Sequence, residues 1–162
     1  MVRQDTLDEA AALLDLLRAR GLTVATAESC TGGLIAAALT SAAGSSDVVA
    51  CGFVTYSNAA KAAMLGVPAE CITAHGAVSE AVALRMADGA LQRSEADLAV
   101  AVTGIAGPGG GSPDKPVGLV WFGAGRRGSP VWAEREVFPG DRTAVREAAV
   151  RRAFQVLRRL AG

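Results

Sequence analysis

Apolar positions along the chain fall into short continuous runs separated by stretches with helical spacing. The short runs are rich in β-branched and other apolar residues, which is typical of strands, and the run at 98–103 has the composition of a strand buried on both faces. The predicted strands cover residues 22–27, 48–56 and 98–103, followed by a hairpin of 117–123 and 131–138 around the turn at 125–130.

Between these runs, apolar residues recur at the spacing of amphipathic helices. Asp5 or Thr6 can cap a first helix that ends before Gly21, and residues 34–40 form a nearly all-apolar helix. Ser57 can cap a short helix through residue 65, and another helix covers about 79–91. Asp141 can cap the last helix.

Strands that alternate with helices and then end in a hairpin indicate an α/β protein. We expect a mixed, mostly parallel sheet with helices on both sides. Because no linker, repeat or low-complexity segment divides the chain, residues 1–162 are predicted to form a single domain.

Charge and composition narrow the classes of partner. The 16 basic and 16 acidic residues balance, so nucleic acid is not an expected partner, and the arginine-rich stretch at 151–159 fits the solvated face of a terminal helix. The apolar runs are shorter than the roughly 18 residues of a membrane span, and the polar start does not resemble a signal peptide. We therefore expect a cytoplasmic protein without membrane partners.

The cysteine and histidine content does not favour a metal site or a disulfide framework. The three cysteines form no CxxC pair, and His75 is the single histidine, so one subunit cannot supply two histidine ligands. We expect neither a metal nor another cofactor.

The segment 28–33 (ESCTGG) lies where the first strand ends and a helix begins, a common ligand position in α/β sheets. Ser29 there could act as a nucleophile, with main-chain N–H groups of the following turn holding an oxyanion. The alternative is that Ser29 or Thr31 merely caps the helix. The paired Gly32 and Gly33 favour close approach of the backbone to a ligand.

Tyr56 and Lys61 follow the second strand and are expected to overhang the same edge of the sheet as Ser29. A buried lysine with a lowered pKa can take a proton from a serine without any histidine. The alternative is an exposed lysine on an amphipathic helix.

Two further segments suggest a bound anion or sugar. The glycine-rich loop after Thr103 precedes a strand rather than a helix, which excludes a Walker or dinucleotide-binding loop, but its main-chain N–H groups can wrap a ligand. Arg142 and Arg146 are neighbours near the amino end of the last helix, where the two cations repel one another and oppose the helix dipole. A bound anion would offset both of these penalties. Salt bridges to Asp141 or Glu147 are the alternative.

Together these segments resemble the CinA carboxy-terminal domain family, whose enzymatic members are nicotinamide-nucleotide amidohydrolases. The matching segments occur in the family's order along nearly the whole chain: 27–33 (AESCTGG), 56–58 (YSN) with Lys61, 65–67 (LGV), 76–79 (GAVS), 103–108 (TGIAGP), 115–118 (KPVG) and 140–142 (GDR). The resemblance implies a three-layer α/β/α fold, a homodimer or higher homo-oligomer, and hydrolysis of nicotinamide mononucleotide to nicotinic acid mononucleotide and ammonia.

The resemblance also implies roles for individual residues. Ser29 would attack the amide carbon, Lys61 would accept its proton, and Tyr56 would orient Lys61 or relay the proton to ammonia. The remaining candidates would bind the small phosphorylated substrate. They are the main-chain amides of Cys30, Thr31 and Gly32 at the oxyanion with Gly33 next to them, Thr103, Gly104, Gly107 and Gly109 at the ribose or nicotinamide, and Arg142 with Arg146 at the phosphate. Two rivals stay open, a non-catalytic nucleotide-binding module that regulates competence or damage responses, and an enzyme acting on a different small amide.

Overall fold

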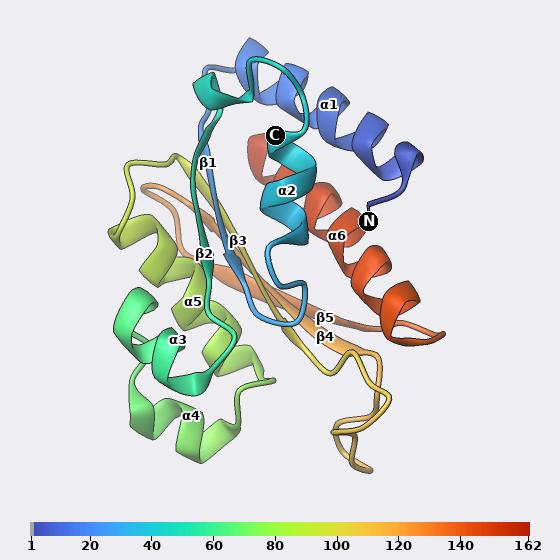
Figure 1. Cartoon of the computed structure of the whole chain (residues 1–162). Coiled ribbons are helices and arrows are strands. Elements are labelled where there is room, and N and C mark those ends of the chain that lie inside the picture. The colour runs from blue at the N-terminus through green and yellow to red at the C-terminus, as the bar shows by residue number, and fades with distance from the viewer. Residues whose placement is uncertain (1) are drawn as a thin grey trace.

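A five-stranded sheet runs through the centre of the protein (Figure 1), and the computed structural model describes residues 2–162. Its strands lie in the order β2-β1-β3-β4-β5, so the three strands that come first in the chain occupy one side of the sheet. Their bounds are β1 Val24–Glu28, β2 Val49–Val54, β3 Leu98–Gly104, β4 Leu119–Arg126 and β5 Trp132–Val137.

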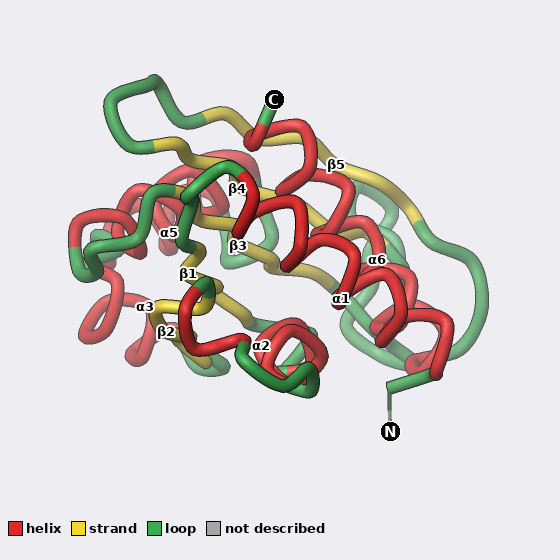
Figure 2. The backbone as a smooth tube through the Cα atoms, turned by 90° about the horizontal axis from the view of Figure 1, so that it is seen from above, coloured by secondary structure: helices red, strands yellow, loops and turns green. Residues whose placement is uncertain are grey.

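Helices cover both faces of this sheet, which gives the three-layer α/β/α fold (Figure 2). Their bounds are α1 Gln4–Ala19, α2 Leu34–Thr40, α3 Asn58–Leu65, α4 Ala69–His75, α5 Glu80–Gln92 and α6 Arg142–Ala161, with a 3-10 turn at Ser45–Asp47. One core cluster joins the sheet to α1, α2 and α6, and a second joins it to α3, α4 and α5. Since β3 lies between the two clusters, six of its seven residues are buried.

The sheet is evenly divided between parallel and antiparallel pairs, so the expectation that it is mostly parallel is wrong. β1 pairs in parallel with β2 and with β3, whereas β3–β4 and β4–β5 are antiparallel. The reason lies in the connections: helices join the first three strands, but only a loop joins β3 to β4, and a parallel pair needs a crossover. The predicted hairpin is confirmed as β4 and β5.

Most helix predictions are confirmed, with two differences. Ser57 caps α3 and Asp141 caps α6 through their side chains, as expected. The first helix instead begins at Gln4 after Arg3, with no side-chain cap, and Asp5 and Thr6 lie inside it. Helix α4 was not predicted, because its seven residues bury only one side chain and therefore carry no clear apolar periodicity.

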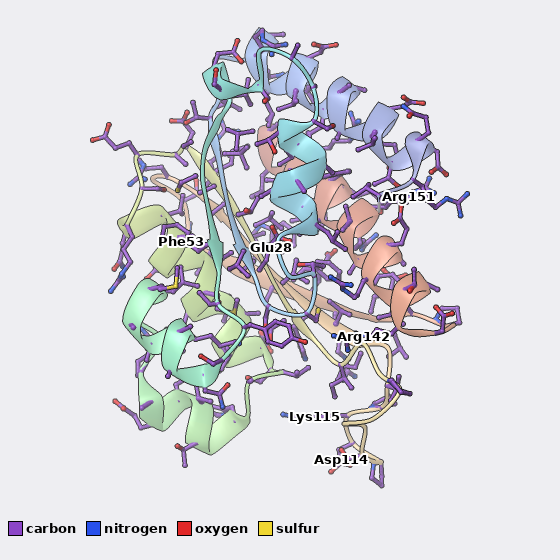
Figure 3. All side chains as sticks on the ribbon, viewed as in Figure 1. Glu28, Phe53, Asp114, Lys115, Arg142 and Arg151 are labelled. Atoms are coloured by element: carbon purple, nitrogen blue, oxygen red, sulfur yellow. The ribbon has the colours of Figure 1, made fainter. Side chains whose placement is uncertain are left out.

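The arginines of α6 are partly exposed, as expected of a solvated helix face, and they also form ion pairs with neighbouring elements. Arg151 forms ion pairs with Asp5 and Glu9 of α1, and Figure 3 shows it on the side of α6 that faces α1. Arg152 and Arg159 both pair with Glu134 of β5. These contacts tie α6 to its two neighbours. Across residues 2–162, every helix is too short or too polar to cross a bilayer.

Candidate active site

A cavity of about 220 Å³ lies where β1, β2 and β3 end and α6 begins. These strand ends and the amino end of α6 lie at the lower edge of the sheet in Figure 1. The residues that line it come from five separate segments of the chain: Ser29, Cys30, Tyr56, Asn58, Lys61, Ala77, Val78, Thr103, Gly104, Ala106 and Arg142.

Ser29 and Lys61 are in direct contact inside this cavity. The Lys61 Nζ lies 2.9 Å from the Ser29 Oγ and donates a second hydrogen bond of 2.8 Å to the Thr55 carbonyl. Only 1% of the lysine is exposed, so the alternative of an exposed lysine on an amphipathic helix is wrong. Burial lowers the pKa of Lys61 below its ordinary value of 10.5, because the charged amine loses its water.

The turn after Ser29 exposes some main-chain donors and uses others. The Ser29 N–H donates to the Val102 carbonyl, and the Gly32 N–H donates to the Ser29 carbonyl. Gly32 is therefore not a free oxyanion donor, contrary to expectation. Within residues 2–162, the N–H groups of Cys30, Thr31 and Gly33 have no hydrogen-bond acceptor in another residue. Gly32 and Gly33 have φ of 60° and 96°, so the shape of the turn itself requires glycine.

The helix that follows this turn is held by Glu28 rather than by a hydroxyl. Gly33 occupies the N-cap position of α2 without a side-chain cap, which excludes capping by Ser29 or Thr31. The fully buried Glu28 carboxylate instead accepts hydrogen bonds from the N–H groups of Ile35 and Ala36, at 2.9 and 3.0 Å (Figure 3). Sequence analysis missed this role, because a carboxylate seven residues before its partner lies outside the usual capping spacing.

Cys30 also lines the cavity, next to Ser29. Its thiol is buried, and desolvation raises its pKa to about 11. The thiolate, which is the reactive form of cysteine, is therefore a minor species near neutral pH. This microenvironment favours the hydroxyl of Ser29 over the sulfur of Cys30 as a nucleophile.

Tyr56 and Arg142 meet at the exposed side of the cavity. The Arg142 guanidinium donates to the Tyr56 hydroxyl and to the Gly107 carbonyl, each at 2.9 Å. Tyr56 is 62% exposed, and the Thr55 carbonyl, not the phenol, holds Lys61. Figure 3 shows Arg142 at the same edge of the sheet as the loop that carries Lys115.

The glycine-rich loop contributes less to the cavity than expected. Thr103 lines it and donates to the Ala77 carbonyl at 2.9 Å. Gly104 also lines it, although an added Cβ there would lie 2.8 Å from the Leu119 carbonyl oxygen, so packing alone requires glycine. Gly107 does not line the cavity but has a φ of 83° and accepts the hydrogen bond from Arg142. The exposed Gly109 does not line it either.

Thr31 and Arg146 lie behind the turn rather than on the cavity wall. The Thr31 side chain is completely buried, and its hydroxyl has no partner within the described residues. Arg146 donates from Nε to the Cys30 carbonyl at 3.1 Å and from its terminal nitrogen to the Thr31 carbonyl at 3.2 Å. Neither Asp141 nor Glu147 pairs with Arg142 or Arg146 in the described part of the chain.

Four residues of the cavity wall had no role assigned from the sequence: Asn58, Ala77, Val78 and Ala106. All four lie within the segments 56–58, 76–79 and 103–108 that carry the family resemblance. Their location in these segments could have identified them as site residues, but their small or apolar side chains suggest no chemistry by themselves.

Comparisons with known proteins find the same family that these segments resemble. The family model described as the CinA C-terminal domain matches residues 6–161. Among curated proteins, the Escherichia coli protein named nicotinamide-nucleotide amidohydrolase PncC is 57% identical over 142 residues, which cover 87% of this chain and 86% of that protein. A competence-damage inducible protein of Symbiobacterium thermophilum is 54% identical over 96% of this chain, which spans only 38% of that relative.

Solved structures are similar as well. The crystal structure of the competence/damage inducible protein CihA from Agrobacterium tumefaciens has a TM-score of 0.96 and 52% sequence identity, with 100% of this chain and 99% of that chain covered. A CinA superfamily protein from Klebsiella pneumoniae has a TM-score of 0.92 and 43% identity over 98% of this chain and 99% of that chain.

Proposed function

The chain belongs to the CinA C-terminal domain family, and on that premise we propose that it hydrolyses the carboxamide of nicotinamide mononucleotide to nicotinic acid mononucleotide and ammonia. The observation that carries this proposal is the 2.9 Å contact between the Lys61 Nζ and the Ser29 Oγ inside the cavity. The name of the Escherichia coli relative supplies the substrate class.

The contact supports nucleophilic catalysis by serine with a lysine base. When Lys61 is neutral, its lone pair can face the Ser29 hydroxyl and accept its proton as Ser29 attacks the amide carbon. The resulting ammonium returns that proton to the amide nitrogen, the C–N bond breaks, and ammonia leaves an acyl ester on Ser29. Water then adds to the ester and gives its proton to Lys61, and collapse releases the acid as the proton returns to Ser29.

The negative oxygen that forms during each addition needs a hydrogen-bond donor. The Cys30 N–H is suited to this task, because Cys30 lines the cavity beside Ser29 and its N–H has no acceptor in another residue within residues 2–162. A donor of this kind contributes about 3 kcal/mol to transition-state stabilisation in other acyl-transfer enzymes. The Thr31 N–H lies deeper and is a less direct candidate.

The nucleotide part of the substrate would extend toward Arg142. Its guanidinium is exposed, lines the cavity and binds the phenol of Tyr56, so the pair offers a cation and a hydroxyl to a phosphate at the opening. Tyr56 therefore acts in substrate binding rather than in orienting Lys61, a change from the sequence-based hypothesis.

A non-catalytic nucleotide-binding module explains the same cavity less well. Burying an amine costs free energy unless its partners compensate, and a module that only binds gains nothing from a lysine placed against a serine. The geometry therefore favours an enzyme over this rival.

The test is ammonia release from nicotinamide mononucleotide, nicotinamide riboside, free nicotinamide and glutamine. We expect turnover of the mononucleotide, weaker use of the riboside, and loss of activity in Ser29→Ala with retention in Cys30→Ser. Release from glutamine alone would support the rival amidase, and absence of release from all four would support the binding module. A Cys30→Ser variant that is inactive beside an active Ser29→Ala would assign the nucleophile to Cys30.

A further inference from the structure

Arg146 makes an unusual pair of contacts beside the proposed nucleophile. Its guanidinium spans two consecutive carbonyls, those of Cys30 and Thr31, at 3.1 and 3.2 Å. The charge is half-buried against the turn, and a Cβ added to Gly32 would lie 3.3 Å from the terminal nitrogen of Arg146. Unlike Arg142, Arg146 does not line the cavity.

These contacts determine which way the neighbouring N–H groups point. In a planar trans peptide, the carbonyl of one residue and the N–H of the next point in opposite directions. Holding the Thr31 carbonyl therefore turns the Gly32 N–H away from Arg146, and that N–H donates to the Ser29 carbonyl. Holding the Ser29 carbonyl in turn fixes the direction of the Cys30 N–H.

A chain of polar contacts thus runs from Arg146 to the cavity. It passes from the guanidinium to the Thr31 carbonyl, through that peptide to the Gly32 N–H, and on to the Ser29 carbonyl. It ends at the N–H of Cys30, a residue that lines the cavity together with Ser29. Successive hydrogen bonds of this kind polarise one another, and the positive charge at the far end strengthens the donor at the near end.

We propose that Arg146 is a positioning residue that orients and polarises the Cys30 N–H for the reacting oxygen, and that it does not bind the substrate phosphate. The inference rests on the proposed function, because it assigns that N–H to the oxyanion. Arginine suits this position better than lysine, because its planar guanidinium presents N–H donors side by side in fixed directions, whereas the lysine ammonium is a point charge on a flexible stem.

The test compares Arg146→Met and Arg146→Lys with Arg142→Met and with Arg85→Met, which removes an exposed arginine of α5. For both Arg146 variants we expect kcat on nicotinamide mononucleotide to fall about tenfold to a hundredfold, as for other small misplacements of catalytic groups. Their KM and their preference for the mononucleotide over the riboside should stay near the native values. Arg142→Met should show the opposite pattern, and Arg85→Met should match the native enzyme.

A second measurement does not depend on the natural substrate. A fluorophosphonate probe labels an activated serine: the Ser29 oxygen bonds to phosphorus, fluoride leaves, the serine proton passes to Lys61, and the phosphoryl oxygen takes the place of the oxyanion. We expect the labelling rate of both Arg146 variants to fall by a factor similar to that in kcat. Arg146→Lys keeps the positive charge and is therefore expected to fold. If Arg146→Met does not fold, Arg146→Lys alone still tests the role of the two side-by-side guanidinium donors.

Several outcomes would overturn the inference. A raised KM with unchanged kcat and a lost preference for the mononucleotide would make Arg146 a phosphate ligand, and unchanged kinetics and labelling would remove it from the site. A native protein that labels at Ser29 but releases no ammonia contradicts only the proposed function, and the labelling rates still decide the role of Arg146. A native protein that is not labelled at Ser29 would overturn the inference as well.

Discussion

Lys61 shows how a single residue combines a cost in stability with a chemical use. Its amine is buried beside Ser29 and the Thr55 carbonyl, and that burial lowers its pKa. The neutral form, which is needed to accept a proton, is therefore more populated than for a lysine in water. The same lowering of the pKa destabilises the folded protein at every pH at which the lysine of the unfolded chain is charged.

Replacing Lys61 by methionine should therefore lower activity and raise stability. We expect kcat to fall by about a hundredfold to ten-thousandfold, the usual range for a lost general base. Between the lowered pKa and 10.5, the unfolded chain binds more protons than the folded protein, so the free energy of unfolding of the native protein rises with pH. Lys61→Met should lose this rise and be more stable than native protein near neutral pH.

Urea unfolding at several pH values measures both effects. Ser29→Ala is the matched control, because it removes the proposed nucleophile but keeps the buried amine and with it the pH dependence. An Lys61→Met variant with native activity, or with the native rise of stability with pH, would contradict this account of Lys61.

At the scale of elements, α2 is a short helix whose first turn is stabilised by a side chain from the strand before it. Seven residues give little helical stability by themselves, and glycine at the N-cap adds none through its side chain. The buried Glu28 carboxylate supplies acceptors for two of the N–H groups at the start of the helix. Because Glu28 immediately precedes Ser29, the same contacts hold the turn that carries the proposed nucleophile.

Glu28→Gln should destabilise the protein measurably. A glutamine keeps one acceptor but turns an NH₂ group toward the second backbone N–H, which leaves a buried donor unsatisfied at a cost of about 1–3 kcal/mol. Urea unfolding gives this difference, and Glu95→Gln, at an exposed glutamate, should change stability by less than about 0.5 kcal/mol. Equal stability of the two variants would show that the carboxylate does not hold α2.

At the scale of the whole molecule, the layers approach closely because small residues lie between them. Helix α5 packs against β4 at Gly123, where an added Cβ would lie 2.1 Å from the Ala83 carbonyl oxygen. A second close approach joins α5 to α3, where a Cβ on Gly89 would lie 2.0 Å from the Leu65 carbonyl oxygen. These contacts keep α3, which carries Lys61, at a fixed distance from the sheet that carries Ser29.

Gly123→Ala should therefore force α5 away from the sheet. Because the clash is with backbone, relief requires a shift of the whole helix, and we expect a loss of about 1–3 kcal/mol in thermal or urea unfolding. Gly109→Ala is the matched control, since a Cβ there meets nothing within 4 Å. A Gly123→Ala variant as stable as the control would show that the layers are not closely packed at this point.

The order of apolar and polar residues determined much of the architecture by itself. It indicated the five strands, the hairpin, helices on both faces, and the caps at Ser57 and Asp141, because each of these depends on neighbours along the chain. It also indicated the residue types for chemistry: the hydroxyl of Ser29 at a strand end, and a lysine near the same sheet edge in a chain with one histidine. Helix α4 and the balance of parallel and antiparallel pairs escaped it.

Only the tertiary structure decided how these residues meet. The burial of Lys61 against Ser29, the support of α2 by Glu28 and the contact of Arg146 with two carbonyls each join segments that are distant in sequence or unusual in spacing. The same packing separated Arg142 at the cavity from Arg146 behind the turn, although both lie on one helix. Periodicity reports which face of an element is apolar, whereas distances between side chains depend on how the layers pack together.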